Sequence, residues 1–192
     1  IASIVILITS AYPTMGANVG GAISQTAAYL LFIMLIFDVK LDLKKVILIG
    51  ISVVAVVGAF AFFDIVSGSE SHLGLFVQQI FLNGPSAIIQ TFARKIGMNV
   101  KLAQTSVWVN ILIVSIVIIG VLIFKPSGYF KKINDKYPMI FKGFMASFVG
   151  CIVTLLVNDS GIVAAATAAI YILIPIIIIS INMIIFDNNE IK

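Results

Sequence analysis

Residues 162–186 form a continuous apolar run that contains no charged side chain. The run exceeds the roughly 20 residues that a helix needs to cross the hydrocarbon core of a bilayer. Backbone N–H and C=O groups find no water in lipid, so such a segment crosses a membrane as a helix. Composition agrees, because charged residues make up 10% of the chain, against about 25% in soluble domains.

Five further apolar runs lie at residues 1–12, 22–37, 46–66, 106–124 and 139–157. Barrel strands would alternate in polarity and be about half as long. We therefore expect an all-α fold, a polytopic transmembrane helix bundle of about six spans that forms one membrane domain over residues 1–192. The first run starts at Ile1 without an initiator methionine, which indicates a fragment of a longer chain. Pro175 is expected to kink the last span.

Residues 75–92 do not fit the pattern of a span. They are moderately apolar, but they contain several glutamines and the helix-breaking pair Gly84-Pro85. This composition favours an interfacial or re-entrant helix over a membrane crossing.

The lysines predict the orientation of the chain. They concentrate in the connectors at residues 38–45 and 125–138, which we therefore place in the cytoplasm. The segment 67–105 and the turn at 158–161 then both lie on the exoplasmic side. In a rival topology residues 75–92 cross the membrane. The lysine-rich connector at 125–138 would then lie outside, against the positive-inside rule.

Three cations on the expected exoplasmic side, Arg94, Lys95 and Lys101, run against the usual distribution of charge. A phosphate headgroup would explain them, because arginine offers a planar donor fork and lysine a compact charge. The alternative is snorkelling to ordinary anionic lipid. Two functions are also open for Gly16, Gly20 and Gly21. They either bring backbone amides close to an anion or permit tight helix packing.

Candidate acid–base groups fall on the same side. Asp159 lies in the turn Asn158-Asp159-Ser160-Gly161 between two apolar runs, Asp64 approaches that side from the third run, and His72 is the only histidine. The two carboxylates could act in acid–base chemistry, bind a cation, or pair with Arg94 and Lys95. The four turn residues are also those that form ordinary tight turns. One histidine with scattered carboxylates does not predict a metal site.

Short motifs in a fixed order carry a resemblance to a known family. GANVGG at 16–21 is followed by SHLG, FVQQ, Arg-Lys-x3-Asn at 94–99 and NDSG at 158–161. This order resembles the C-terminal membrane portion of a bacterial envelope protein family of unassigned function, chiefly from Gram-positive lineages. Members often carry an alkaline-phosphatase-like domain ahead of this portion, and no hydrolase chemistry is carried over to this chain. The resemblance implies a multi-pass protein of the bacterial plasma membrane. It marks seven positions: Gly16, Asn18, Gly20, Gly21, His72, Asn158 and Asp159.

Together these features favour a membrane protein that handles a lipid-linked or phosphate-bearing envelope precursor by transfer chemistry. Arg94, Lys95 and Lys101 would hold the phosphate, with His72 or Asp159 as acid or base. A transporter or flippase is the first alternative, and a non-catalytic scaffold or complex subunit is the second. The expected partners are membrane lipids, a polyprenyl-phosphate-linked substrate and other membrane subunits, with no nucleic acid, because the basic residues lie in short blocks beside apolar runs. The sequence does not identify whether a cofactor is used or which one.

Overall fold

The computed structural model describes residues 1–12, 14–67 and 72–190, without side chains at 67, 72–74 and 187–190. This part of the chain forms nine helices and no strands, which confirms the predicted all-α fold. The helices are α1 (Ala2–Ala11), α2 (Val19–Ile36), α3 (Leu43–Ser67), α4 (His72–Asn83), α5 (Ser86–Thr105), α6 (Trp108–Phe124), α7 (Gly128–Lys136), α8 (Pro138–Val157) and α9 (Gly161–Glu190).

Four helices are long and apolar enough to cross a membrane on their own, namely α2, α3, α8 and α9. Helices α5 and α6 meet at 100° and would make a fifth span if they act together as one broken crossing. All six predicted apolar runs are helical, and the protein is a multi-span helical membrane protein. Pro175, at which a kink is expected, lies inside α9, and the helix continues through this residue to Glu190.

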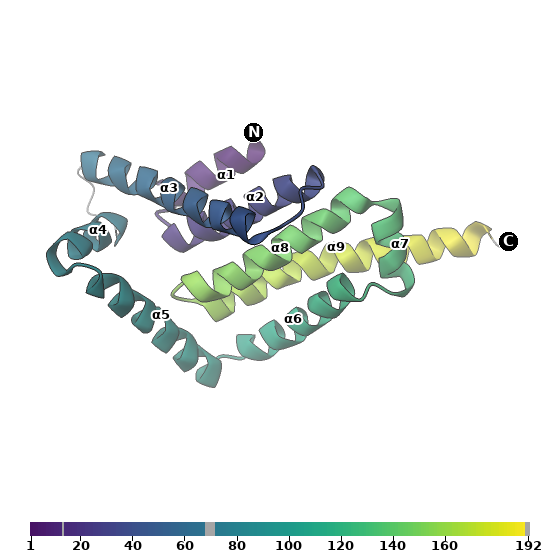
Figure 1. Cartoon of the computed structure of the whole chain (residues 1–192). Coiled ribbons are helices and arrows are strands. Elements are labelled where there is room, and N and C mark those ends of the chain that lie inside the picture. The colour runs from purple at the N-terminus through teal and green to yellow at the C-terminus, as the bar shows by residue number, and fades with distance from the viewer. Residues whose placement is uncertain (13, 68–71, 191–192) are drawn as a thin grey trace.

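The centre of the molecule is the layer formed by α2, α8 and α9, which lie side by side (Figure 1). Helix α6 packs on the α9 side of this layer, and α1 and α3 pack against α2. Small residues let the helices approach closely. Ala165, Ala166 and Ala169 of α9 are completely buried, and a Cβ added at Gly150 of α8 would lie 2.9 Å from the Cβ of Ala28 on α2.

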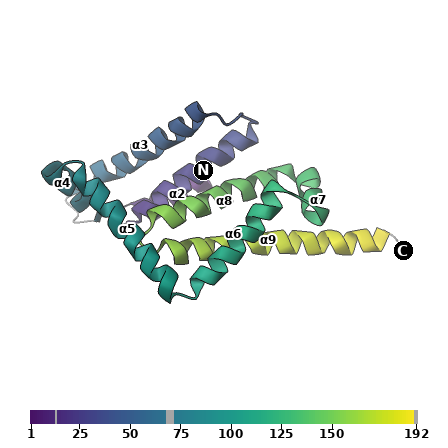
Figure 2. The same ribbon diagram turned by 60° about the horizontal axis from the view of Figure 1, so that its bottom comes forward.

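Residues 75–92 form parts of two helices rather than one element. Helix α4 ends at Asn83, Gly84 adopts a positive φ of 65° that favours glycine, and α5 starts after Pro85. In both views α4 and α5 lie at the end of the bundle opposite α7 (Figures 1 and 2). The predicted non-crossing segment is thus a helical hairpin that precedes the apolar α6.

The two lysine-rich connectors meet at the α7 end. Lys142 near the start of α8 forms a 2.6 Å ion pair with Asp38 in the α2–α3 connector. Helix α7 buries Phe130 and Ile133 against the bundle and exposes Lys131, Lys132 and Lys136. The lysines of both connectors therefore lie at one end of the molecule, and α4, α5 and the α8–α9 turn lie at the other.

Candidate functional site

The α8–α9 turn is held by a side chain from another helix. Asn99 of α5 donates from Nδ2 to the carbonyl oxygens of Leu155 (3.0 Å) and Asn158 (3.5 Å). Its Oδ1 accepts a hydrogen bond from the backbone N–H of Ile162 (3.3 Å). These are backbone groups at the end of α8 and the start of α9, which lack partners within their own helices. One amide therefore fixes the turn against α5.

This anchoring places Asp159 opposite two cations of α5. Its Oδ1 lies 3.2 Å from Arg94 Nη1 and 3.3 Å from Lys95 Nζ. Arg94 is 58% exposed and Lys95 19%, while Asp159 is 46% exposed. Lys95 and Asn99 are four residues apart in α5, so the lysine that binds the carboxylate and the asparagine that binds the turn share one face of this helix.

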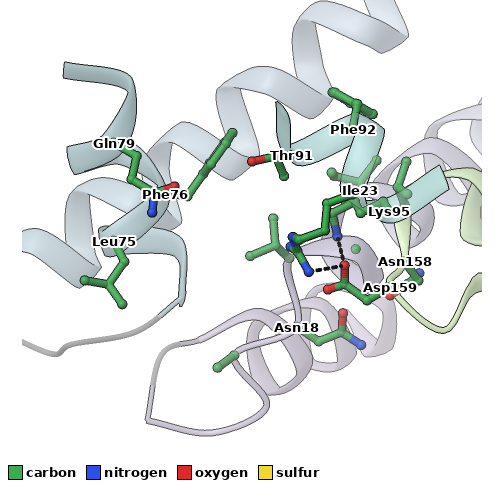
Figure 3. Close-up of a pocket in the computed structure, with 15 residues that line it drawn as sticks. Asn18, Ile23, Leu75, Phe76, Gln79, Thr91, Phe92, Lys95, Asn158 and Asp159 are labelled. Atoms are coloured by element: carbon green, nitrogen blue, oxygen red, sulfur yellow. Dashed lines mark ion pairs between the residues drawn. The ribbon is translucent and has the colours of Figure 1, made fainter. Parts of the chain in front are cut away.

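The ion-paired groups border a cavity of about 460 Å³. It lies between the start of α2, the α4–α5 hairpin and the α8–α9 turn, with α4 side chains on one side and Asn18, Asn158 and Asp159 on the other (Figure 3). The apolar part of the lining comprises Ala17, Val19, Ile23, Leu75, Phe76, Phe92 and Val157. The polar part comprises Asn18, Gln79, Thr91, Arg94, Lys95, Asn158 and Asp159.

Residues 16–21, which contain Gly16, Gly20 and Gly21, contribute to this cavity mainly by packing against other parts of the chain. Asn18 caps α2, because its Oδ1 accepts from the N–H of Gly21 at 2.8 Å. The N–H of Gly16 donates to the carbonyl oxygen of Thr9 at 3.0 Å. At Gly20 an added Cβ would collide with Asn158 Oδ1. Asn18 and Gly20 line the cavity, whereas the amides of Gly16 and Gly21 are engaged within the chain.

Among the described side chains, two other predicted site residues, Asp64 and Lys101, do not line the cavity. Asp64 is completely buried in α3 and has a polar contact. Lys101 lies on α5, two turns beyond Arg94, and is exposed. His72 is the first residue of α4, and its side chain lies outside the described residues.

Thr91 and Gln79 are polar cavity residues that the sequence did not single out. Asn99 belongs to the Arg-Lys-x3-Asn motif, but its contacts with the α8–α9 turn were not predicted. The signal was present on α5, since residues 91, 95 and 99 follow a four-residue spacing that puts them on one helical face. The sequence predicts one element at 75–92, whereas α5 starts at Ser86 and continues to Thr105. The four-residue pattern therefore runs across the end of the predicted element.

Within the described residues, no three His, Cys, Asp or Glu side chains come together in a way that could hold a metal ion. Comparison with family models, curated proteins and solved structures gives no match to this chain. The geometry of the cavity is thus the basis for assigning a function to this membrane protein.

Proposed function

We propose that the cavity binds the phosphate of a lipid-linked cell-envelope precursor at the exoplasmic face of a bacterial plasma membrane. The observation that carries this proposal is the presence of Arg94 and Lys95 side by side on the cavity wall, opposed by one carboxylate, Asp159. Two cations and one anion leave one net positive charge at the site. This charge favours an anionic ligand.

The rest of the lining supports a lipid rather than a free ion. Phe76 and Phe92 from the α4–α5 hairpin and Val157 from α8 form an apolar wall next to the cations. A cavity with an apolar wall and a few convergent polar groups is typical of sites for amphipathic small molecules. A phosphate ester with a hydrocarbon tail matches both parts of this lining.

The exoplasmic location and the transfer chemistry rest on the sequence. The lysine-rich connectors lie at the opposite end of the molecule, and by the positive-inside rule that end faces the cytoplasm. Headgroup or glycan transfer would use Asp159 or His72 as acid or base, because the polar residues gather on the expected exoplasmic side of the chain.

Equilibrium binding of a short-chain phosphatidic acid to the full chain in neutral detergent tests the proposal. Arg94→Gln and Lys95→Gln should each weaken binding by about tenfold or more, because hydrogen bonds to charged groups contribute about 1.5–3 kcal/mol. Lys131→Gln on α7 removes the same charge at the opposite end and serves as the matched control. Inorganic phosphate should compete weakly, since it lacks the tail. Equal affinities for all three variants would exclude the cavity as the phosphate site.

A further inference from the structure

Asp159 occupies the position at which a ligand phosphate would meet Arg94 and Lys95. A single oxygen, Oδ1, faces both cations at 3.2 and 3.3 Å. This atom is enclosed, and none of the described residues gives it a hydrogen bond of good geometry. The side chain as a whole is 46% exposed, so its other oxygen is the part that faces solvent.

The contacts of Asp159 leave much of the donor capacity unused. Charge-assisted N–H···O bonds are usually about 2.7–2.9 Å long, and both contacts here are longer. Arg94 approaches the carboxylate through one of its two terminal nitrogens. A phosphate has three oxygens available and matches the planar guanidinium fork, so it can engage Arg94 and Lys95 together with better geometry.

The fold does not need this ion pair to hold the turn. Asn99 already binds backbone groups of Leu155, Asn158 and Ile162. The Asp159 side chain is itself 46% exposed, so solvent rather than packed protein lies beside much of it. The carboxylate can therefore leave its cations while the backbone stays in place.

We infer that Asp159 is an internal counter-ion that the phosphate of the ligand displaces when it binds. This inference rests on the proposed function, and it specifies the class of ligand. A ligand carboxylate would make the same contacts with Arg94 and Lys95 that Asp159 already makes. Asp159 is tethered beside these cations, so its high local concentration favours it over the free carboxylate. A phosphate ester that bonds to both cations replaces Asp159 with a stronger contact. Asp159 thus selects phosphate esters over carboxylates.

The test is whether the affinity for short-chain phosphatidic acid rises or falls when the Asp159 carboxylate is removed. Asp159→Asn should bind short-chain phosphatidic acid about three- to tenfold more tightly than the unmodified chain, because two partly exposed ion pairs no longer compete with the ligand. Asp159→Ser, which also suits a turn, should behave in the same way. Asp135→Asn on α7 makes the same change of charge away from the cavity and controls for net charge. Acetate should begin to compete with the lipid only in the Asp159 variants.

The outcomes separate this inference from the proposed function. In an Arg94→Gln background the gain from Asp159→Asn should shrink, since one of its two partners is gone. If Arg94→Gln and Lys95→Gln weaken binding but neither Asp159 variant tightens it, the phosphate site stands and the counter-ion role is wrong. The same conclusion follows if the Asp159 variants lose thermal stability with no gain in affinity, because the ion pair is then structural. If no variant alters binding, the proposed function fails and the inference fails with it.

Discussion

Asn99 Nδ2 on α5 lies 3.0 Å from the carbonyl oxygen of Leu155 at the end of α8, although 56 positions separate the two residues in the sequence. Through this contact an amphipathic helix at one end of the bundle supports the turn that carries Asp159. The same side chain accepts from the N–H of Ile162, so it joins the end of α8 to the start of α9.

Replacement of Asn99 by alanine should lower the free energy of unfolding by about 1–3 kcal/mol, because backbone groups at two helix ends lose their partners. Thermal unfolding of the full chain in detergent measures this change. Gln104→Ala removes an exposed amide from the same helix and should have little effect. Equal unfolding temperatures for the two variants would show that the Asn99 contacts do not stabilise the turn.

Gly161 should tolerate no side chain. A Cβ at this position would collide with the carbonyl oxygen of Leu155 and lie 2.9 Å from Asn99 Nδ2, and a backbone carbonyl has little freedom to move. We expect Gly161→Ala to cost about 1–3 kcal/mol of stability through overpacking. Gly58→Ala on α3 is the matched control, because a Cβ there meets nothing within 4 Å and alanine favours a helix over glycine. A stabilised Gly161→Ala variant would contradict the close approach.

The helices could be predicted from the sequence because membrane spans are a local pattern. The run at 162–186 requires a helix whatever surrounds it, and α9 starts and continues as this pattern indicates. The boundary between α4 and α5 was harder to place, since the turn depends on Gly84 adopting a positive φ within a moderately apolar stretch.

The site was predictable in part. The sequence predicts Asp159, Arg94 and Lys95 as site residues from their charges in an apolar chain, and the ion pairs between them are one of the arrangements that it allows. The contact between Asn99 and Leu155 depends on how α5 crosses the end of α8, which no local pattern encodes. The packing of Gly20 against Asn158 has the same origin, because two distant turns must first be brought together.

Lys101 should contribute less to ligand binding than Lys95, although both were predicted to bind phosphate. Lys95 lines the cavity and Lys101 does not. Lys101→Gln should therefore change the affinity for short-chain phosphatidic acid by less than about threefold, the range expected for a screened charge at a distance. The binding assay with Lys95→Gln in parallel checks this expectation. A loss as large as that of Lys95→Gln would extend the site along α5.

The start of α3 should loosen in acid. Asp42 accepts a hydrogen bond from the backbone N–H of Lys45 at 3.0 Å, and its other oxygen pairs with Lys45 Nζ at 3.1 Å. The backbone bond, and then the side-chain bond, lower the pKa of Asp42 below its ordinary value of 3.8. A lowered pKa in the folded state means that this stabilisation is present above the ordinary pKa and is lost as the pH falls through the lowered value.

Hydrogen exchange of the first amides of α3 measures this loosening as a function of pH. Asp42→Asn provides the control, because asparagine also caps a helix but does not ionise in this range. The variant should lose the acid dependence of protection and keep the protection itself. An unchanged pH profile in Asp42→Asn would assign the effect to another group.

The two ends of the bundle should face opposite sides of the membrane. Ser160 in the α8–α9 turn and Ser127 before α7 are both exposed and lie at opposite ends, and the lysines gather at the Ser127 end. Single cysteines at these positions, in a background where the buried Cys151 is replaced by alanine, can be labelled in intact cells with a membrane-impermeant reagent. By the positive-inside rule, Ser160→Cys should react from outside and Ser127→Cys only after permeabilisation. If Ser127→Cys is labelled from outside, the protein has the opposite orientation in the membrane. The Arg94–Lys95 cavity then faces the cytoplasm, where an exoplasmic precursor could not reach it.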